Sequence, residues 1–122
     1  MVKGVGTDII EIKRIRKALE RNGQRFLDKV LTSREQDYCK DFKDPTQRYA
    51  GRFSAKEAVA KVFGTGFGKE LSFHDIEILN DKRGQPLVSF SEKVKASFDD
   101  PKVLISISHS DEYANAVAIW VA

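Results

Sequence analysis

The chain has 122 residues, of which 41% are hydrophobic and 32% are charged, proportions typical of a folded globular protein rather than a disordered one. Its length suits a single domain, residues 1–122, because two ordinary cores would need more chain. The only cysteine, Cys39, excludes an internal disulfide framework and a multi-cysteine metal site, and it favours a reducing, cytoplasmic setting. No apolar stretch is long enough to span a bilayer, so no membrane partner is expected.

The positive charge is concentrated in one quarter of the chain. The whole sequence has 21 basic and 18 acidic side chains, a net charge of +3. Residues 11–34 alone have eight basic and three acidic ones, a net charge of +5, and we call them the basic segment. A basic face suits an acidic partner, although a solvated helix surface would carry the same charges.

The N-terminal part of the chain predicts a strand followed by helices. Residues 2–7 predict the strand. Apolar residues at helical spacing predict a helix that begins after Asp8 as its N-cap, with Glu11 completing a capping box, and that ends at Gly23. Residues 26–31 predict a second, short helical stretch.

Capping signals predict two further helices. Thr32 and Glu35 match a capping box, so a helix is expected to start near residue 33. Asp44 then suits the N-cap of the longest helix, with Pro45 at its first position and Gly64 closing it. The first half of the chain is therefore mainly helical.

Beyond the glycine-rich loop at residues 64–68, the hydrophobic period changes from 3.6 to 2, which indicates strands. One or two helical turns are expected at residues 91–98. The expected strands cover residues 73–79, 87–90, 103–108 and 113–121, with a turn at 81–86 and a hairpin joining the last two. Helices in the N-terminal half packed on a mainly antiparallel sheet make an α+β fold.

Glu57 and Lys61 are one helical turn apart on the longest helix, with Phe53 on the same face and Arg52 and Ser54 expected close to it. An exposed ion pair would explain Glu57 and Lys61. They would equally provide a carboxylate for a cation and an ammonium for a phosphate. Sequence spacing alone leaves both readings open.

Asp8 has two readings as well. It is either a helix cap or a ligand for a hard metal ion at the end of a strand. Magnesium usually takes one or two protein carboxylates, with waters and substrate phosphate oxygens completing its shell. Asp8 together with Glu57 would meet that requirement.

Two other patterns are weaker. The loop at residues 64–68 closes a helix, whereas a phosphate-binding P-loop opens one, so a plain helix cap and a phosphate-lining loop both remain open. Residues 106–111 include serine, histidine and aspartate, but neighbours on a strand point to opposite faces, which argues against a hydrolytic triad. His109 is expected at the rim of a cleft.

Three segments, taken in order, carry a family resemblance. They are residues 4–9 (GVGTDI), residues 52–66 (RFSAKEAVAKVFGTG) and residues 105–110 (ISISHS), the last preceded by Gly-Gln-Pro at 84–86. In so short a chain they resemble the holo-acyl-carrier-protein synthases, the small bacterial 4′-phosphopantetheinyl transferases. The resemblance covers essentially the whole chain, and its middle segment is the most specific.

The resemblance implies an enzyme that moves 4′-phosphopantetheine from coenzyme A to a serine of apo acyl carrier protein and releases 3′,5′-ADP, in support of fatty acid biosynthesis. It also implies a magnesium requirement and a homotrimer with an active site at each subunit interface. Positioning and charge neutralisation dominate such phosphoryl transfers. The proton of the attacking serine could pass to Glu57 or to a water.

The resemblance also assigns site residues. Asp8 and Glu57 match the family's metal ligands, and Lys61 matches the lysine that reaches the coenzyme A phosphates. The family has lysine where this chain has Gln85, so a charged contact from that position is not expected. The residues that fall where the family lines the coenzyme A site are Arg52, Lys61, Gly64, Thr65, Gly66, Pro86 and His109.

With this resemblance, the basic segment acquires a candidate partner, since acyl carrier protein is small and acidic. Arg14, Arg21 and Arg25 would steer and orient it. The alternative is a small basic module that binds nucleic acid, which would need exposed aromatic side chains beside basic ones. The aromatic residues of the strand half do not accompany basic clusters, so nucleic acid is not the expected partner.

Overall fold

The computed structural model describes all 122 residues, and it has the expected α+β architecture. A single 3-10 turn, η1 (Phe73–Asp75), leads from the helical half to the second strand. The other elements, in chain order, are β1 (Val2–Glu11), α1 (Ile12–Asn22), α2 (Gln24–Val30), α3 (Ser33–Lys40), α4 (Pro45–Phe63), β2 (Ile76–Asn80), β3 (Pro86–Phe90), α5 (Glu92–Ser97), β4 (Lys102–His109) and β5 (Tyr113–Val121).

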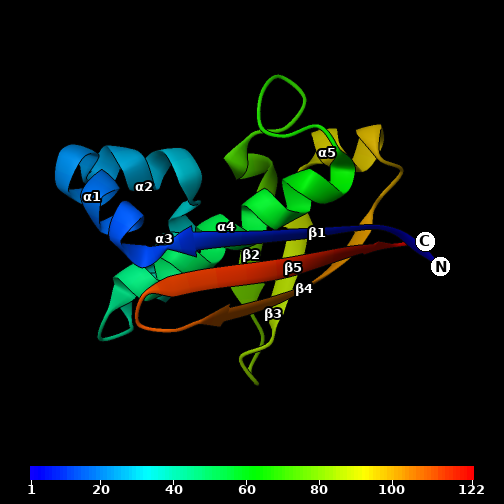
Figure 1. Cartoon of the computed structure of the whole chain (residues 1–122). Helices are drawn as coiled ribbons and strands as arrows, with labels where there is room; N and C mark the ends of the chain where they lie inside the picture. The colour runs from blue at the N-terminus through cyan, green and yellow to red at the C-terminus, as the bar shows by residue number, and fades with distance from the viewer.

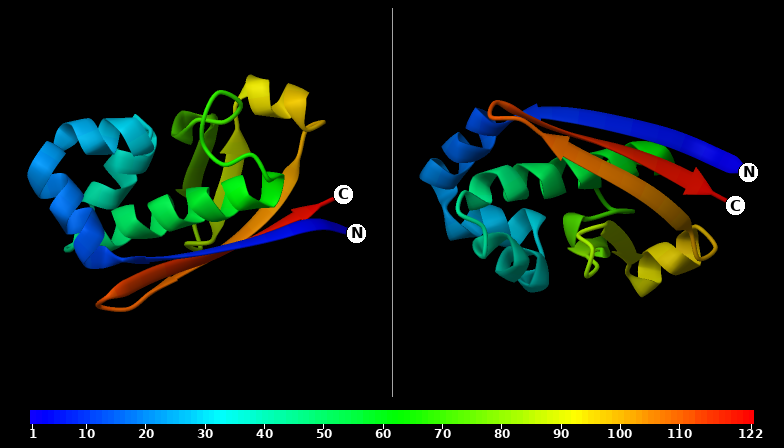
Figure 2. Two further views of the ribbon diagram at one scale, coloured as in Figure 1. Left: turned by 45° about the horizontal axis from the view of Figure 1, so that its top comes forward. Right: turned by 90° about the horizontal axis from the view of Figure 1, so that it is seen from below.

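The strands form two antiparallel sheets around α4. The larger sheet has the order β1-β5-β4, and β2 pairs with β3 in the smaller one. Helix α4 lies across one face of the larger sheet, while α1, α2 and α3 gather near its N-terminal end (Figures 1 and 2). The three alanines of β5 that face α4 are buried, and their small size lets the helix approach the strands. They are Ala114, Ala116 and Ala118.

Helix α4 has the predicted capping at both ends. The Asp44 side chain accepts a hydrogen bond from the Thr46 N–H, Pro45 occupies the first turn, and Gly64 adopts a left-handed conformation with φ 77°. The Thr32–Glu35 capping box of α3 is also confirmed. These local signals succeed because each satisfies backbone groups at a helix end with the nearest available side chain.

A buried ion pair joins α4 to the elements beside it. The Lys56 ammonium donates to Glu35 Oε1 at 2.7 Å and to two backbone carbonyls, and both side chains are fully buried. Glu35 Oε2 in turn accepts the N–H of Ile78 on β2. The pair therefore ties α3, α4 and β2 together through the core.

Two apolar clusters pack against different halves of α4. One packs its C-terminal half against both sheets and α5, and the other packs its N-terminal half against α1, α2 and α3. Cys39 belongs to the second cluster, where burial raises the pKa of its thiol to about 11. Its surroundings therefore fit a packing role and disfavour the reactive thiolate.

The start of α1 differs from the prediction. Asp8 is not its N-cap, because β1 continues to Glu11 in register with β5 and α1 begins only at Ile12. The Ile12 N–H donates to the carbonyl of Glu112 at 2.8 Å instead of to a capping side chain. Cross-strand pairing with a distant segment thus replaces the local cap, which frees the Asp8 carboxylate for other contacts.

The strand expected at residues 73–79 also begins later, at Ile76. Residues 73–75 form η1 because Asp75 and Ser72 make a reciprocal capping box at this point. His74 consequently lies in the turn and not at the start of a strand.

The face of the larger sheet that points away from α4 carries exposed apolar side chains. Val5, Ile119 and Leu104 are cross-strand neighbours there, and Val5 and Leu104 are more than half exposed. Phe90 and Trp120 are partly buried and pack against an apolar cluster that also includes residues of α4. None of the helices combines the length and apolar character needed to cross a membrane.

Candidate active site

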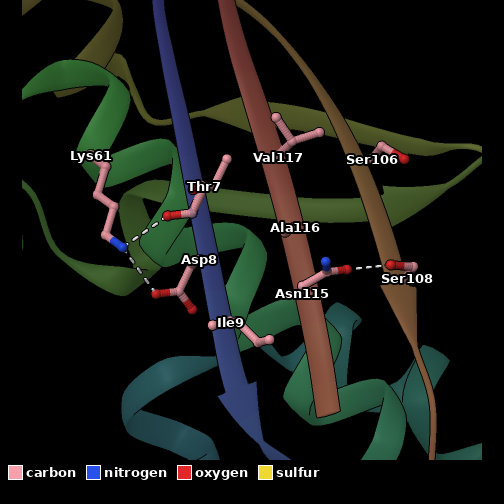
Figure 3. A pocket seen from close by; sticks show the side chains of 9 residues that line it. All are labelled: Thr7, Asp8, Ile9, Lys61, Ser106, Ser108, Asn115, Ala116 and Val117. Atoms are coloured by element: carbon pink, nitrogen blue, oxygen red, sulfur yellow. Dashed lines mark hydrogen bonds and ion pairs between the residues drawn. The ribbon is translucent and has the colours of Figure 1, made fainter.

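The candidate site is built where β1 crosses α4, and Asp8 is at its centre. Ser54 Oγ lies 3.0 Å from both Asp8 Oδ2 and the Asp8 carbonyl oxygen, so a side chain of α4 orients this carboxylate. The Lys61 ammonium donates to the Thr7 carbonyl at 2.8 Å and to Asp8 Oδ1 at 3.3 Å (Figure 3). Both oxygens of the Asp8 carboxylate are therefore engaged.

Glu57 lies one helical turn before Lys61 and is half-buried. Burial raises the pKa of the Glu57 carboxyl, the nearby charge of Asp8 raises it further, and Lys61 opposes both effects. The site thus places two carboxylates near each other, with one ammonium paired to Asp8. Such an arrangement favours the arrival of a further cation.

The donor set fits magnesium better than a metal held by protein ligands alone. No group of three or more histidine, cysteine, aspartate or glutamate side chains is arranged to bind a metal ion. Two carboxylates are enough for magnesium, which keeps several waters and binds substrate phosphates. The charge of Asp8 contributes, after burial, to the raised pKa of Glu57, and a shared cation would relieve this repulsion.

Two open cavities lie on either side of the Asp8 carboxylate. The first, of about 440 Å³, is mainly polar and extends across β1 to the outer face of the larger sheet (Figure 3). Its lining comprises Thr7, Asp8, Ile9, Lys61, Ser106, Ser108, Asn115, Ala116 and Val117. Ser108 Oγ is hydrogen-bonded to Asn115 Oδ1 there.

The second cavity, of about 360 Å³, is mainly apolar and lies between α1, α2 and α4. Glu57 and Arg14 border it, and the apolar lining includes Ile15, Ala18, Phe26 and Phe53. Of these, the sequence interpretation placed only Phe53 on the Glu57 face. For Ile15 and Ala18, the signal available in the sequence was their spacing on one helix face, but this spacing is equally typical of an ordinary core face.

Comparison with known proteins identifies the family. Residues 4–118 match the family model of the 4′-phosphopantetheinyl transferase superfamily. Holo-[acyl-carrier-protein] synthase of Protochlamydia amoebophila is 52% identical over 120 residues, covering 98% of each chain.

The chain belongs to the 4′-phosphopantetheinyl transferase superfamily.

Solved structures place it within one branch of that superfamily. The crystal structure of Helicobacter pylori holo-[acyl-carrier-protein] synthase in complex with coenzyme A is 37% identical, with a TM-score of 0.89 over 96% of this chain and 99% of that one. The Neisseria meningitidis synthase is 31% identical, with a TM-score of 0.91 over the whole of both chains. The chain is thus an enzyme of the holo-[acyl-carrier-protein] synthase type.

Arg52 does not lie near the Glu57 face, contrary to the expectation from sequence. It is buried, hydrogen-bonded to Asn80 Oδ1 and placed over the ring of Tyr38, with its Nε lacking a partner. Five residues correspond to about 500° of helix rotation, so Arg52 and Glu57 point about 140° apart. Arg52 consequently contacts α3 and β2 rather than the Asp8 site.

The other residues expected at a coenzyme A site are spread over the chain. Gly64, Thr65 and Gly66 form an exposed loop after α4. Pro86 begins β3 and borders a groove of about 470 Å³ between β3 and β4, and His109 is exposed at the end of β4. Neither cavity beside Asp8 includes any of these residues.

The three arginines expected to dock a partner are all exposed. Arg14 lies on α1 at the edge of the apolar cavity, Arg21 is in the last turn of α1, and Arg25 is in α2. The basic segment therefore borders one side of the apolar cavity. Its helices α1 and α2 lie beside the N-terminal half of α4 (Figure 2).

Proposed function

We propose that this chain transfers 4′-phosphopantetheine from coenzyme A to a serine of apo acyl carrier protein, releases 3′,5′-ADP, requires Mg²⁺ and serves fatty acid biosynthesis in the cytoplasm. The cluster of Asp8, Glu57 and Lys61 carries the proposal. Two adjacent carboxylates and an ammonium suit a substrate with a pyrophosphate group. The relationship to a Helicobacter pylori synthase in complex with coenzyme A supports this substrate.

Asp8 and Glu57 would hold the magnesium ion. When bound, the ion supplies charge neutralisation to the pyrophosphate, which is the main requirement of such transfers. Ser54 fixes the orientation of the Asp8 carboxylate, and the Lys61 ammonium would neutralise the charge that develops on the departing 3′,5′-ADP. Glu57 or a water would accept the proton of the attacking serine hydroxyl.

Coenzyme A would also contact residues that lie apart within one chain. Of the positions given by the family resemblance, these are Lys61, Gly64, Thr65, Gly66, Pro86 and His109. Arg52 is left out because it is buried against α3 and β2. Pro86 and His109 line neither cavity beside Asp8, and a second copy of the chain would be a way to bring them to a coenzyme A bound there. We therefore include in the proposal a homotrimer with active sites at its interfaces.

The outer face of the larger sheet is the surface that we assign to this self-association. It carries the exposed apolar side chains of Val5, Ile9 and Leu104, and burial of such side chains favours association. The polar cavity opens onto the same face beside Asp8, so a neighbouring copy seated there would close one wall of the active site. Gln85 would give this neighbour a neutral side chain where the family has lysine.

The carrier protein would dock on the other side, against α1 and α2. Arg14, Arg21 and Arg25 would steer the acidic partner, and the apolar cavity beside Glu57 would receive an apolar side chain of its helix. Docking here brings the acceptor serine toward the two carboxylates.

The metal assignment is tested by two conservative variants. Asp8→Asn and Glu57→Gln should each lower the transfer of labelled phosphopantetheine to apo carrier protein by about a hundredfold or more, because one charged ligand is lost in each. Glu92→Gln, a matched change of an exposed glutamate on α5, should retain full activity. Full activity of Asp8→Asn or Glu57→Gln at ordinary magnesium concentration contradicts the assignment.

A further inference from the structure

The Lys61 ammonium is already paired with the Asp8 carboxylate, the group proposed to hold the metal ion. It hydrogen-bonds to Asp8 Oδ1 at 3.3 Å and to the Thr7 carbonyl at 2.8 Å (Figure 3). The other carboxylate oxygen, Oδ2, accepts the Ser54 hydroxyl from the body of α4. Oδ1 is therefore the oxygen that is not held by Ser54, and it is paired with Lys61, which lines the polar cavity.

A metal ion and this ammonium compete for the same oxygen. Both are cations, so a divalent ion at Oδ1 would repel Lys61 as well as replace its hydrogen bond. Lys61 is able to withdraw, because its side chain is 55% exposed and its four-carbon stem starts from the last turn of α4. Its ammonium then needs a new anionic partner.

The nearest new anion would be the phosphate group bound to the same cation. We propose that Lys61 is the resident counter-ion of Asp8 in the free enzyme, and that metal binding transfers this ammonium from Asp8 to the coenzyme A phosphates. The inference rests on the proposed function, which assigns magnesium to Asp8 and coenzyme A to Lys61. It adds the exchange of partners and its consequence for the order of binding.

The consequence is positive coupling between the two ligands. Without coenzyme A, the metal must break the Lys61–Asp8 contact and leave an ammonium beside a dication, so metal binding is weak. With coenzyme A present, the displaced ammonium finds a phosphate, and each ligand strengthens the binding of the other. In the free enzyme, before the exchange, the Lys61 ammonium offsets part of the negative charge of Asp8 and Glu57.

Manganese, a paramagnetic substitute for magnesium, provides a direct measurement that does not depend on turnover. Its binding to the free enzyme is followed by electron paramagnetic resonance, with and without coenzyme A. Lys61→Met should bind Mn²⁺ about three- to fivefold more tightly than wild type when coenzyme A is absent, a change equal to the loss of one exposed ion pair. Added coenzyme A should then strengthen Mn²⁺ binding less in the variant than in wild type.

Two further variants make the result specific. Lys93→Met removes the same charge from an ion pair with Asp75, a carboxylate of η1 outside both cavities beside Asp8, and should leave Mn²⁺ affinity unchanged. Asp8→Ala should abolish Mn²⁺ binding at this site, with and without coenzyme A. Retention of that site in Asp8→Ala contradicts the proposed metal ligands themselves.

A different result overturns the exchange alone. If Asp8→Ala loses the metal but Lys61→Met binds Mn²⁺ no more tightly than wild type, Lys61 does not compete for the site, whereas the proposed function stands. Equal coupling by coenzyme A in Lys61→Met and wild type leads to the same conclusion. Melting temperatures of all variants establish that each is folded.

Discussion

Gly6 on β1 lies directly against Ala58 on α4, so closely that a Cβ at position 6 would be 2.3 Å from the Ala58 carbonyl oxygen. No real Cβ tolerates this distance, and the atom that blocks it is backbone, which cannot rotate away. The contact sets how closely the strand rests on the helix. Asp8, two residues further along β1, reaches Ser54 on α4 because of it.

Gly6→Ala should therefore lower the free energy of unfolding by about 3 kcal/mol, the upper part of the range for overpacked cores. Urea denaturation followed by circular dichroism measures the change. Gly68→Ala is the matched control, since a Cβ there would meet no atom within 4 Å, and it should alter stability by less than about 0.5 kcal/mol. A Gly6→Ala protein as stable as Gly68→Ala contradicts the close packing of β1 on α4.

Lys56→Met should destabilise the fold much more than loss of an exposed lysine does, because Lys56 belongs to a buried ion pair. It leaves the buried Glu35 carboxylate without its cation, a loss of about 3–5 kcal/mol. Thermal unfolding compares it with Lys95→Met, which breaks only the exposed pair with Glu92 and should change stability by less than about 1 kcal/mol. Similar melting temperatures for the two variants would show that the buried pair does not hold α3 and β2 on α4.

Acid should weaken the fold through Asp75. Burial alone would raise the pKa of this carboxyl, but hydrogen bonds from Ser72, Ser91 and Lys93 outweigh it and lower the pKa to about 2 from 3.8. The folded-state pKa is depressed, so the stabilisation is complete above about pH 4 and is lost as the pH falls toward 2.

The measurement is the stability of wild type and Asp75→Asn as a function of pH. The wild type should be more stable by about 2 kcal/mol at pH 7, and the difference should shrink between pH 4 and pH 2. A difference that stays constant over this range rules out the Asp75 carboxylate as the source of acid sensitivity.

The loop that follows α4 is anchored by stacked aromatic rings. Phe67 stacks on Phe73 with ring centroids 3.9 Å apart, and Phe73 stacks on Phe53 of α4 at 5.7 Å. Phe67→Ala should loosen residues 64–68, speed proteolysis there, and raise the KM for coenzyme A more than that for carrier protein. Phe67→Leu keeps an apolar contact and should stay close to wild type, so equal kinetics for Phe67→Ala and wild type would remove the loop from the proposed coenzyme A site.

Reversing a docking charge should separate the two substrates. Arg21→Glu should raise the apparent KM for carrier protein about fivefold, the effect of roughly 1 kcal/mol, and leave the KM for coenzyme A nearly unchanged. Lys95→Glu, the same reversal on α5, should change neither. If Arg21→Glu and Lys95→Glu behave alike, the carrier does not dock on α1.

The sequence predicted best what local contacts decide. The Thr32–Glu35 box and the Asp44, Pro45 and Gly64 signals located α3 and α4 because the groups that satisfy their ends are adjacent in the chain. Of the two readings of Asp8, the helix cap is wrong because the competing contact, pairing of β1 with β5, involves residues more than one hundred positions away.

In the candidate site, too, local features could be predicted from the sequence and features that depend on distant segments could not. Glu57 and Lys61 could be placed on one face of α4 from spacing alone, and Asp8 joined them through the family resemblance. Arg52 was placed on the wrong side, because its surroundings come from α3 and β2 and not from its own helix. The contact of Lys61 with Asp8 Oδ1 could not be predicted, since it depends on where β1 crosses α4.

Mass spectrometry of apo acyl carrier protein incubated with this protein, coenzyme A and Mg²⁺ is the most direct test of the proposed transfer. We expect a mass gain of one phosphopantetheine on the carrier's serine, which is lost when magnesium is chelated or Glu57 is replaced by glutamine. An unmodified carrier under these conditions, or full modification by Glu57→Gln in the presence of a chelator, contradicts the proposed transfer and its metal site.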